Sequence, residues 1–402
     1  MQKLIIILLL ITFVFGLKVL EHQCGHDKFR ENYKYESIPQ DPVEESSDIQ
    51  TDMRFKQSSG KCGLVTIPNI DKTQGKNSDL HLYISYTVER GKNTLAHAGW
   101  CQFIDNLGPT HGTVNFNIGL LATKNLHDPI EFEDLMEIVI HEMTHILGFS
   151  DDDVPKWINS KGKPHTVPIV KYVTRGVQRM FLRTPHVLAF AKKYYACETL
   201  LGMPLENQGG SGSAGSHWEK TAIADEYMNA SRSFTQAHFS GFTTNLLRDT
   251  GFYAEVNASM EEKTTYGQGK GCQFITGQCD QKLREFCTPV QDDGLCDFYH
   301  YGSSGCSVGE YNDPDCYTSI IYDNVKCWDT KRNKKVVCTQ NLAKMKVNGF
   351  NGYIQCPENI QEFCEFKKFC PNFCSANGFC LKGLCYCAKG YYGQDCSNYK
   401  SS

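Results

Sequence analysis

The feature of this chain that most constrains its fold is the segment from His141 to Phe149, which reads HEMTHILGF. It places two histidines four residues apart, and a glutamate directly follows the first. If the segment is helical, His141 and His145 share one face about one turn apart. Two neutral imidazoles at that spacing can bind one zinc ion, with Glu142 beside the metal to transfer protons. The segment therefore predicts a helix that carries two ligands of a metal site.

The preceding residues extend this predicted helix. Asp128 can cap it, Pro129 suits its first turn, and Glu131 completes a capping box. Apolar residues then recur at helical spacing, namely Leu135, Ile138, Val139, Ile146 and Leu147. Gly148 is a stop signal. A chance match would bury two histidines and a glutamate among these apolar residues without a use for them, which is costly. The context therefore favours a zinc site for the hydrolysis of peptide bonds.

A catalytic zinc ion needs a third protein ligand and an open position for water or substrate. In the compact form of the motif a histidine lies six residues after the second one, but that position here is Asp151. On the residues alone the ligand is Asp151, a later glutamate, or a histidine displaced by an insertion. The glutamates are Glu198, Glu206, Glu219 and Glu226, and the histidines are His165, His186, His217 and His238. His217 stands out because it closes the flexible glycine-serine loop at 207–216, which could return the chain to the metal.

Composition indicates a secreted or extracellular protein. The apolar run from Leu4 to Phe15 predicts a signal peptide at 1–16, and we expect no transmembrane span after its removal; an uncleaved anchor is the alternative. Sixteen of the 20 cysteines lie between Cys272 and Cys396, and disulfides persist outside the cytosol. The net charge of -4, with no basic run, gives no indication of nucleic-acid binding.

The remaining patterns mix strands and helices, which predicts an α+β fold. Residues 80–88 alternate apolar and polar side chains, as expected of a half-buried strand, and residues 114–118 repeat the pattern. Helices are predicted from Thr184 towards Tyr195 and over 242–249, the second ended by Gly251.

The end of the chain predicts two disulfide-rich units. Ten cysteines from Cys272 to Cys364 indicate a disulfide framework at 266–365, whose connectivity the sequence does not give. The last six follow the spacing of an EGF-like module at 366–402, namely Cys370, Cys374, Cys380, Cys385, Cys387 and Cys396. The acidic start that binds calcium in some such modules is absent. Because these modules mediate contacts or act as spacers, we expect contact with the cell surface or the matrix.

Three stretches resemble the leishmanolysin family of metzincin zinc proteases: HEMTHILGFS, the segment from CETL to GSAGSHWE, and DEYM. The resemblance covers roughly residues 95 to 290. It implies a metzincin-type zinc protease domain at 59–265, acting on proteins or peptides and followed by a disulfide-rich C-terminal domain. It implies His217 as the third zinc ligand and Met228 as the methionine of the Met-turn, a hydrophobic base beneath the metal. Glu142 is then the general base for the attacking water.

The segment EHQCGHD, which contains Cys24, follows the predicted signal peptide. A thiolate is a strong fourth zinc ligand and would block the position of the water. The pattern resembles the leishmanolysin prosegment, which implies that Cys24 inhibits the enzyme until the prosegment at 17–58 is cleaved. A disulfide at Cys24 is the alternative. The chain between Cys24 and the zinc helix is shorter than the family usually has.

A rival hypothesis is a secreted adhesion or binding protein on an inactive protease scaffold. The EGF-like module and the short N-terminal region favour it. The intact set of His141, Glu142 and His145 argues against it, because an inactive scaffold has no need of Glu142.

Overall fold

The computed structural model describes most of the chain between residues 53 and 321, together with shorter segments on either side. The described residues are 35–37, 53–75, 78–92, 94–124, 129–210, 213–231, 237–258, 261–295, 297–299, 304–321, 340, 343–345, 354–355, 374–375, 377–381, 384–387 and 390–400. The predicted signal peptide and Cys24 lie outside them.

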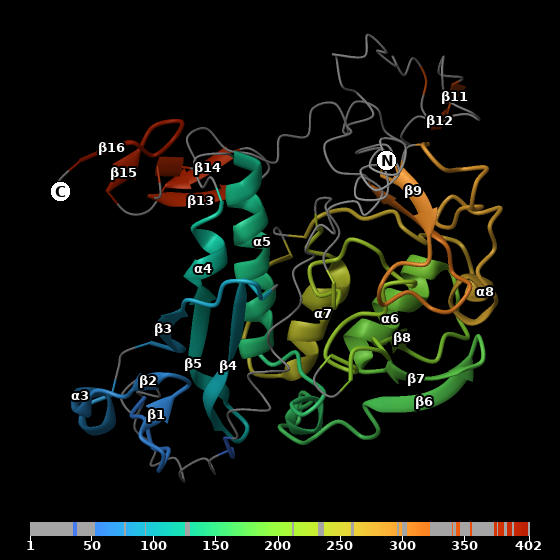
Figure 1. The fold of residues 1–402 in the computed structure, drawn as a ribbon. Coiled ribbons are helices and arrows are strands. Elements are labelled where there is room, and N and C mark those ends of the chain that lie inside the picture. The colour runs from blue at the N-terminus through green and yellow to red at the C-terminus, as the bar shows by residue number, and fades with distance from the viewer. Residues whose placement is uncertain are drawn as a thin grey trace, which may run out of the picture.

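The first half is a three-stranded sheet covered on one face by a long helix (Figure 1). The sheet has the order β3-β5-β4 and consists of β3 (His81–Thr87), β4 (Ala96–Ile104) and β5 (Gly108–Asn117). β3 runs parallel to β5 and β4 runs antiparallel to it. The helix α5 (Pro129–Ile146) packs against β4 and β5, and Trp100, Val114 and Ile146 are buried between them. The predicted zinc helix is therefore confirmed as a helix, and one face of it packs on the sheet.

Smaller elements surround this sheet. They are β1 (Lys61–Cys62), β2 (Val65–Thr66), α3 (Asn69–Thr73) and α4 (Ile118–Leu121). A disulfide between Cys62 and Cys101 ties β1 to β4. It replaces part of the core that so small a subdomain cannot build from apolar side chains alone.

One prediction about β3 is wrong. The strand is present, but its apolar face is not buried along its length, because Ile84, Tyr86 and Val88 are each more than 60% exposed. The reason is the position of β3 at the edge of the sheet, where α5, which packs on β4 and β5, does not cover it. The buried side chain of β3 is Tyr83 on the opposite face, whose hydroxyl donates to Asp71.

The second half is built around a second sheet and two helices. They are the sheet of β6 (Ile169–Thr174), β7 (Val177–Leu182) and β8 (Met203–Pro204), the helices α6 (Pro185–Tyr195) and α7 (Gly241–Thr250), and the short η2 (Val154–Lys156). Both predicted helices are present. α7 ends at Gly251 in the left-handed conformation, with φ of 76°.

One hydrophobic core joins this half to the start of the cysteine-rich region. It includes Phe149, Trp218 and Phe242 and continues through Tyr266 and Phe274. The disulfide between Cys197 and Cys272 links the end of α6 to α8 (Cys272–Thr276). The composition boundary that we propose at 265/266 thus falls within a continuous packing unit.

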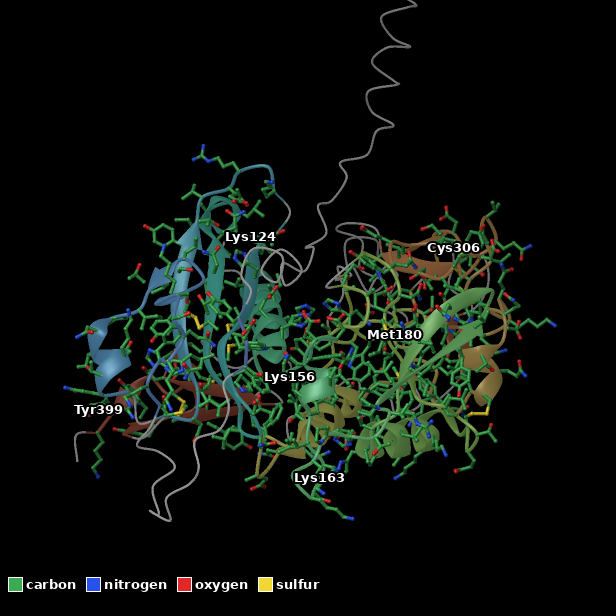
Figure 2. All side chains as sticks on the ribbon, turned by 90° about the horizontal axis from the view of Figure 1, so that it is seen from below. Lys124, Lys156, Lys163, Met180, Cys306 and Tyr399 are labelled. Atoms are coloured by element: carbon green, nitrogen blue, oxygen red, sulfur yellow. A yellow bond between two sulfur atoms is a disulfide. The ribbon has the colours of Figure 1, made fainter. Side chains whose placement is uncertain are left out.

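The described residues of the C-terminal part form short two-stranded hairpins, and disulfides lie among them (Figure 2). Its strands are β9 (Ser304–Ser307), β10 (Thr318–Ile321), β11 (Lys344–Met345), β12 (Ile354–Gln355), β13 (Gly378–Leu381), β14 (Leu384–Cys387), β15 (Tyr391–Tyr392) and β16 (Asn398–Tyr399). Between described residues of this part, the disulfides are Cys279–Cys316, Cys287–Cys306, Cys374–Cys385 and Cys387–Cys396. The α+β class with a disulfide-rich C-terminal region is therefore confirmed. Among the helices in the described part of the chain, none has both the length and the apolar character that crossing a bilayer requires.

Candidate metal centre

Three histidine side chains meet beside α5. His141 and His145 come from the helix, and His217 arrives from the loop 72 residues further along. The Nε2 atom of His145 lies 3.1 Å from Nε2 of His141 and 3.2 Å from Nε2 of His217. A zinc ion bound tetrahedrally at about 2.0–2.1 Å separates its nitrogen ligands by about 3.3 Å. All three residues are buried, so the spacing and the environment both fit a single metal ion.

The other nitrogen of each ring faces a backbone carbonyl. The Nδ1–oxygen distances are 2.5 Å for His141 and Tyr227, 2.7 Å for His145 and Phe149, and 3.0 Å for His217 and Ser213. Because a carbonyl oxygen only accepts, these contacts place the proton of each neutral ring on Nδ1. The lone pair of each Nε2 atom then points into the centre, where three such lone pairs can bind one metal ion. The donor set therefore suits zinc, which binds neutral imidazole.

The end of α5 is shaped to supply one of these carbonyls. Gly148 has φ of 116°, a conformation that residues with a side chain rarely adopt. The turn brings the backbone N–H of Phe149 to the carbonyl of Thr144 and the Phe149 carbonyl to His145. Gly148 thus ends the helix and also allows the turn that orients the His145 ring.

A narrow hairpin carries His217. The backbone N–H of Glu206 donates to the His217 carbonyl, and that of Gly215 donates to the Glu206 carbonyl, each at 2.9 Å. Gly215 has φ of 90°, and a Cβ atom there would lie 2.8 Å from the Met180 side chain and 2.9 Å from Asp151. Only glycine fits this position, which explains the glycine two residues before His217.

A tight turn around Met228 lies against both metal-facing segments. The Met228 carbonyl accepts from the backbone N–H of Trp218, the residue after His217, and the preceding Tyr227 supplies the carbonyl for His141. Met228 is fully buried. The turn is held by Glu226, whose carboxylate accepts from Met228 N, from the hydroxyl of Ser240 and from the hydroxyl of Thr243. Burial raises the pKa of Glu226 to about 7, against the effect of these donors.

The other candidate ligands have different partners. Asp151 accepts from the Ser216 hydroxyl, His165 and His186 contact Asp249, and His238 faces the Asp225 carbonyl. Glu198 is exposed, Glu226 holds the Met228 turn, and Glu206 and Glu219 lie along the His217 hairpin. Among the described residues, the metal-ligating side chains that gather at His141 and His145 are completed by His217 alone.

Glu142 follows His141 on α5 and is fully buried. The residues that sequence reasoning missed act through their backbones, namely Phe149, Ser213 and Tyr227. Every residue has a backbone carbonyl, so the side chains of these three residues do not mark them in the sequence as acceptors. The structure alone identifies them.

Comparisons with known proteins identify the family of the chain. The leishmanolysin family model matches residues 45–330, and a Teneurin-like EGF domain matches residues 370–399. Leishmanolysin of Leishmania major is 27% identical over 311 residues, which is 71% of this chain and 48% of the relative. A leishmanolysin homolog of Crithidia fasciculata is 27% identical over 275 residues, covering 65% of this chain and 39% of the relative. A leishmanolysin-like peptidase of Drosophila melanogaster is 29% identical over 266 residues, covering 55% of this chain and 38% of the relative.

The chain thus matches less than half the length of each of these relatives. The family match nevertheless extends over most of this chain and includes the whole histidine site. The chain therefore belongs to the leishmanolysin family of peptidases.

Proposed function

We propose that this protein is a zinc-dependent endopeptidase that hydrolyses peptide bonds of proteins. The observation that carries the proposal is the convergence of three buried Nε2 atoms, each ring held by a carbonyl at Nδ1. A metal site of this form, with three protein ligands, leaves a fourth position open for water or substrate. Membership of a peptidase family makes a peptide bond the substrate to expect.

In the proposed reaction, His141, His145 and His217 would hold the zinc ion, which would supply Lewis acidity at the site. Glu142 accepts a proton from the attacking water as the new carbon–oxygen bond forms. Glu142 then delivers this proton to the leaving nitrogen as the carbon–nitrogen bond breaks. No serine or cysteine nucleophile is required. Met228 is buried in the turn whose Tyr227 carbonyl faces His141, and its side chain acts as a rigid apolar support beneath the site.

The same proposal places the protein outside the cell. Disulfides in both halves and the EGF-like match at 370–399 support an oxidising environment. The substrates are then extracellular proteins or peptides. The EGF-like module contributes contact with the cell surface or the matrix.

The proposal is tested by chelation. The purified protein, freed of its prosegment, is expected to cleave casein, to lose this activity in 1,10-phenanthroline, and to regain it when zinc is added back. The chelator would remove the group that supplies Lewis acidity to the reaction, so Glu142 alone would not sustain hydrolysis. A folded, zinc-loaded protein that cleaves neither casein nor gelatin would favour the alternative of a binding protein on an inactive scaffold.

We further propose that Cys24 keeps the uncleaved protein latent by occupying the open metal position. Replacing Cys24 by serine is expected to raise the activity of the full-length protein at least about tenfold, because a hydroxyl is a far weaker zinc ligand than a thiolate. Casein hydrolysis before and after prosegment removal measures the effect. Equal latency of the serine variant and the unchanged protein would contradict this role.

A further inference from the structure

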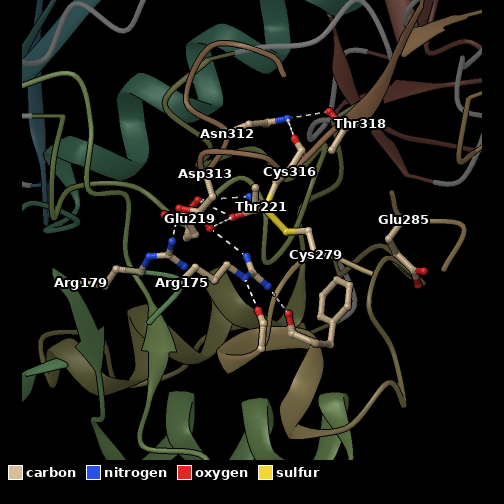
Figure 3. Close-up of a disulfide and its surroundings, with 12 residues drawn as sticks. Arg175, Arg179, Glu219, Thr221, Cys279, Glu285, Asn312, Asp313, Cys316 and Thr318 are labelled. Atoms are coloured by element: carbon tan, nitrogen blue, oxygen red, sulfur yellow. Dashed lines mark hydrogen bonds and ion pairs between the residues drawn. A yellow bond between two sulfur atoms is a disulfide. The ribbon is translucent and has the colours of Figure 1, made fainter. Parts of the chain in front are cut away.

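A buried group of charges links the cysteine-rich region to the sheet of β6 and β7 (Figure 3). Asp313, between β9 and β10, is fully buried. Its Oδ2 atom lies 2.8 Å from the guanidinium of Arg175, and its Oδ1 atom accepts from the guanidinium of Arg179. Both arginines are also buried. A carboxylate and two guanidinium groups at this depth hold one another in fixed positions, since separating them would leave a buried charge unpaired.

The group continues to the base of the His217 hairpin. The Thr221 hydroxyl lies 2.7 Å from Asp313 Oδ2 and 2.7 Å from Glu219 Oε1, so it bridges the two carboxyl groups. The other oxygen of Glu219 accepts from the side chain of Asn207 across the hairpin, also at 2.7 Å. Asp313 is therefore two contacts away from Glu219 on one side of the hairpin that carries His217, and three contacts away from Asn207 on the other side.

A second set of contacts reaches the loop beyond the hairpin base. The side chain of Gln208 donates to the backbone carbonyl of Asn312 at 2.8 Å. A Cβ atom on Gly209 would lie 2.7 Å from the ring of Tyr311, so the two segments are in close contact there. The two residues that precede Asp313 in the sequence thus touch the loop before His217.

This loop needs an external restraint. Its sequence from 207 to 216 is rich in glycine and serine, and glycine loses more conformational freedom on ordering than any other residue. The same loop supplies the Ser213 carbonyl that sets the direction of the His217 ring. If the loop moved, the third Nε2 atom would leave the position that the other two define.

Asp313 is the carboxylate in direct contact with both guanidinium groups, one through each of its oxygen atoms. Its backbone is fixed by the disulfide between Cys279 and Cys316, because the Cys316 N–H donates to the Asp313 carbonyl at 3.1 Å.

We propose that Asp313 is a positioning residue for the third metal ligand, through which the cysteine-rich region holds the His217 loop in its metal-binding conformation. This inference rests on the proposed zinc site. It assigns the cysteine-rich region a direct part in metal affinity, in addition to its part in the common core.

The test is the zinc affinity of the full chain after replacement of Asp313 by asparagine. The side chain keeps its size but loses the charge that holds the two arginines. We expect the dissociation constant for zinc, measured by competition with a chromophoric chelator, to rise about tenfold, as when supporting partners of metal ligands are removed. Replacing Asp249 by asparagine is the matched control, because that buried carboxylate accepts from the N–H groups of His186 and Val187 on α6 rather than from the described residues of the His217 loop.

A second variant, Gln208→Ala, removes only the contact to the Asn312 carbonyl and keeps the test decisive if Asp313→Asn does not fold. It is expected to weaken zinc binding in the same direction by about threefold, below the tenfold of the carboxylate variant. Folded Asp313→Asn protein with the zinc affinity of the unchanged protein would overturn the inference. If Asp313→Asn does not fold, an unchanged zinc affinity in Gln208→Ala would also overturn the inference. An equal loss of zinc affinity in the Asp249→Asn control would overturn it as well. Absence of zinc binding by the unchanged protein would instead overturn the proposed function.

Discussion

Replacing Glu142 by glutamine is expected to lower kcat for peptide hydrolysis by about 10²–10⁴-fold, while the zinc content stays at that of the unchanged protein. Glutamine keeps the size of the side chain but cannot take a proton from the attacking water. Because Glu142 is not one of the three metal-facing residues, its replacement leaves the ligand set intact. Hydrolysis of a quenched fluorescent peptide and elemental analysis of the same sample measure the two quantities.

The matched control for this variant is Glu198→Gln. Glu198 was a candidate ligand on the sequence alone, but it is exposed, so the same chemical change there is expected to alter neither rate nor zinc content. A Glu142→Gln protein that loses its zinc, or that keeps its full rate, would contradict the assignment of Glu142 as general base.

Replacing His217 by alanine is expected to raise the dissociation constant for zinc by more than about 100-fold. Loss of a supporting partner alone costs about 10–100-fold, and the loss of a ligand exceeds that. Activity is expected to fall with zinc occupancy and to recover only partly at high zinc. Isothermal titration of the metal-free protein measures the affinity, and circular dichroism shows whether the fold is retained.

The control is His238→Ala, because His238 is also a buried histidine and its ring faces a backbone carbonyl, that of Asp225. Both substitutions remove the same atoms from a buried site, and circular dichroism of each variant shows whether its fold is retained. If His238→Ala lost zinc and His217→Ala kept it, the ligand set would have to be redrawn.

Local patterns predicted the helix of the site well. The start at Pro129, the apolar spacing and Gly148 define α5 within two residues, since helix periodicity and glycine stops act over one or two turns. α6 and α7 follow their predicted ranges for the same reason.

Position in the sheet was not predictable in this way. The alternation at β3 correctly indicates a strand, but it cannot tell whether α5 covers that strand. Burial of Ile84 and Tyr86 depends on which strand the helix crosses, a property of the assembled fold.

The third ligand illustrates a second limit. Spacing alone left Asp151, four glutamates and four histidines open, and the resemblance to a family singled out His217. The hairpin that brings His217 to the helix depends on hydrogen bonds between residues that are distant from α5 in the sequence. Asp313 lies 96 positions after His217, beyond the reach of any local pattern.

The most direct test of the account is the anomalous diffraction of zinc in crystals of the zinc-loaded protein. We expect a single strong peak about 2.0–2.1 Å from the Nε2 atoms of His141, His145 and His217, with the Nδ1 atoms still facing their carbonyls. A peak bound by a different set of side chains, or a centre from which His217 is absent, would contradict the proposed site.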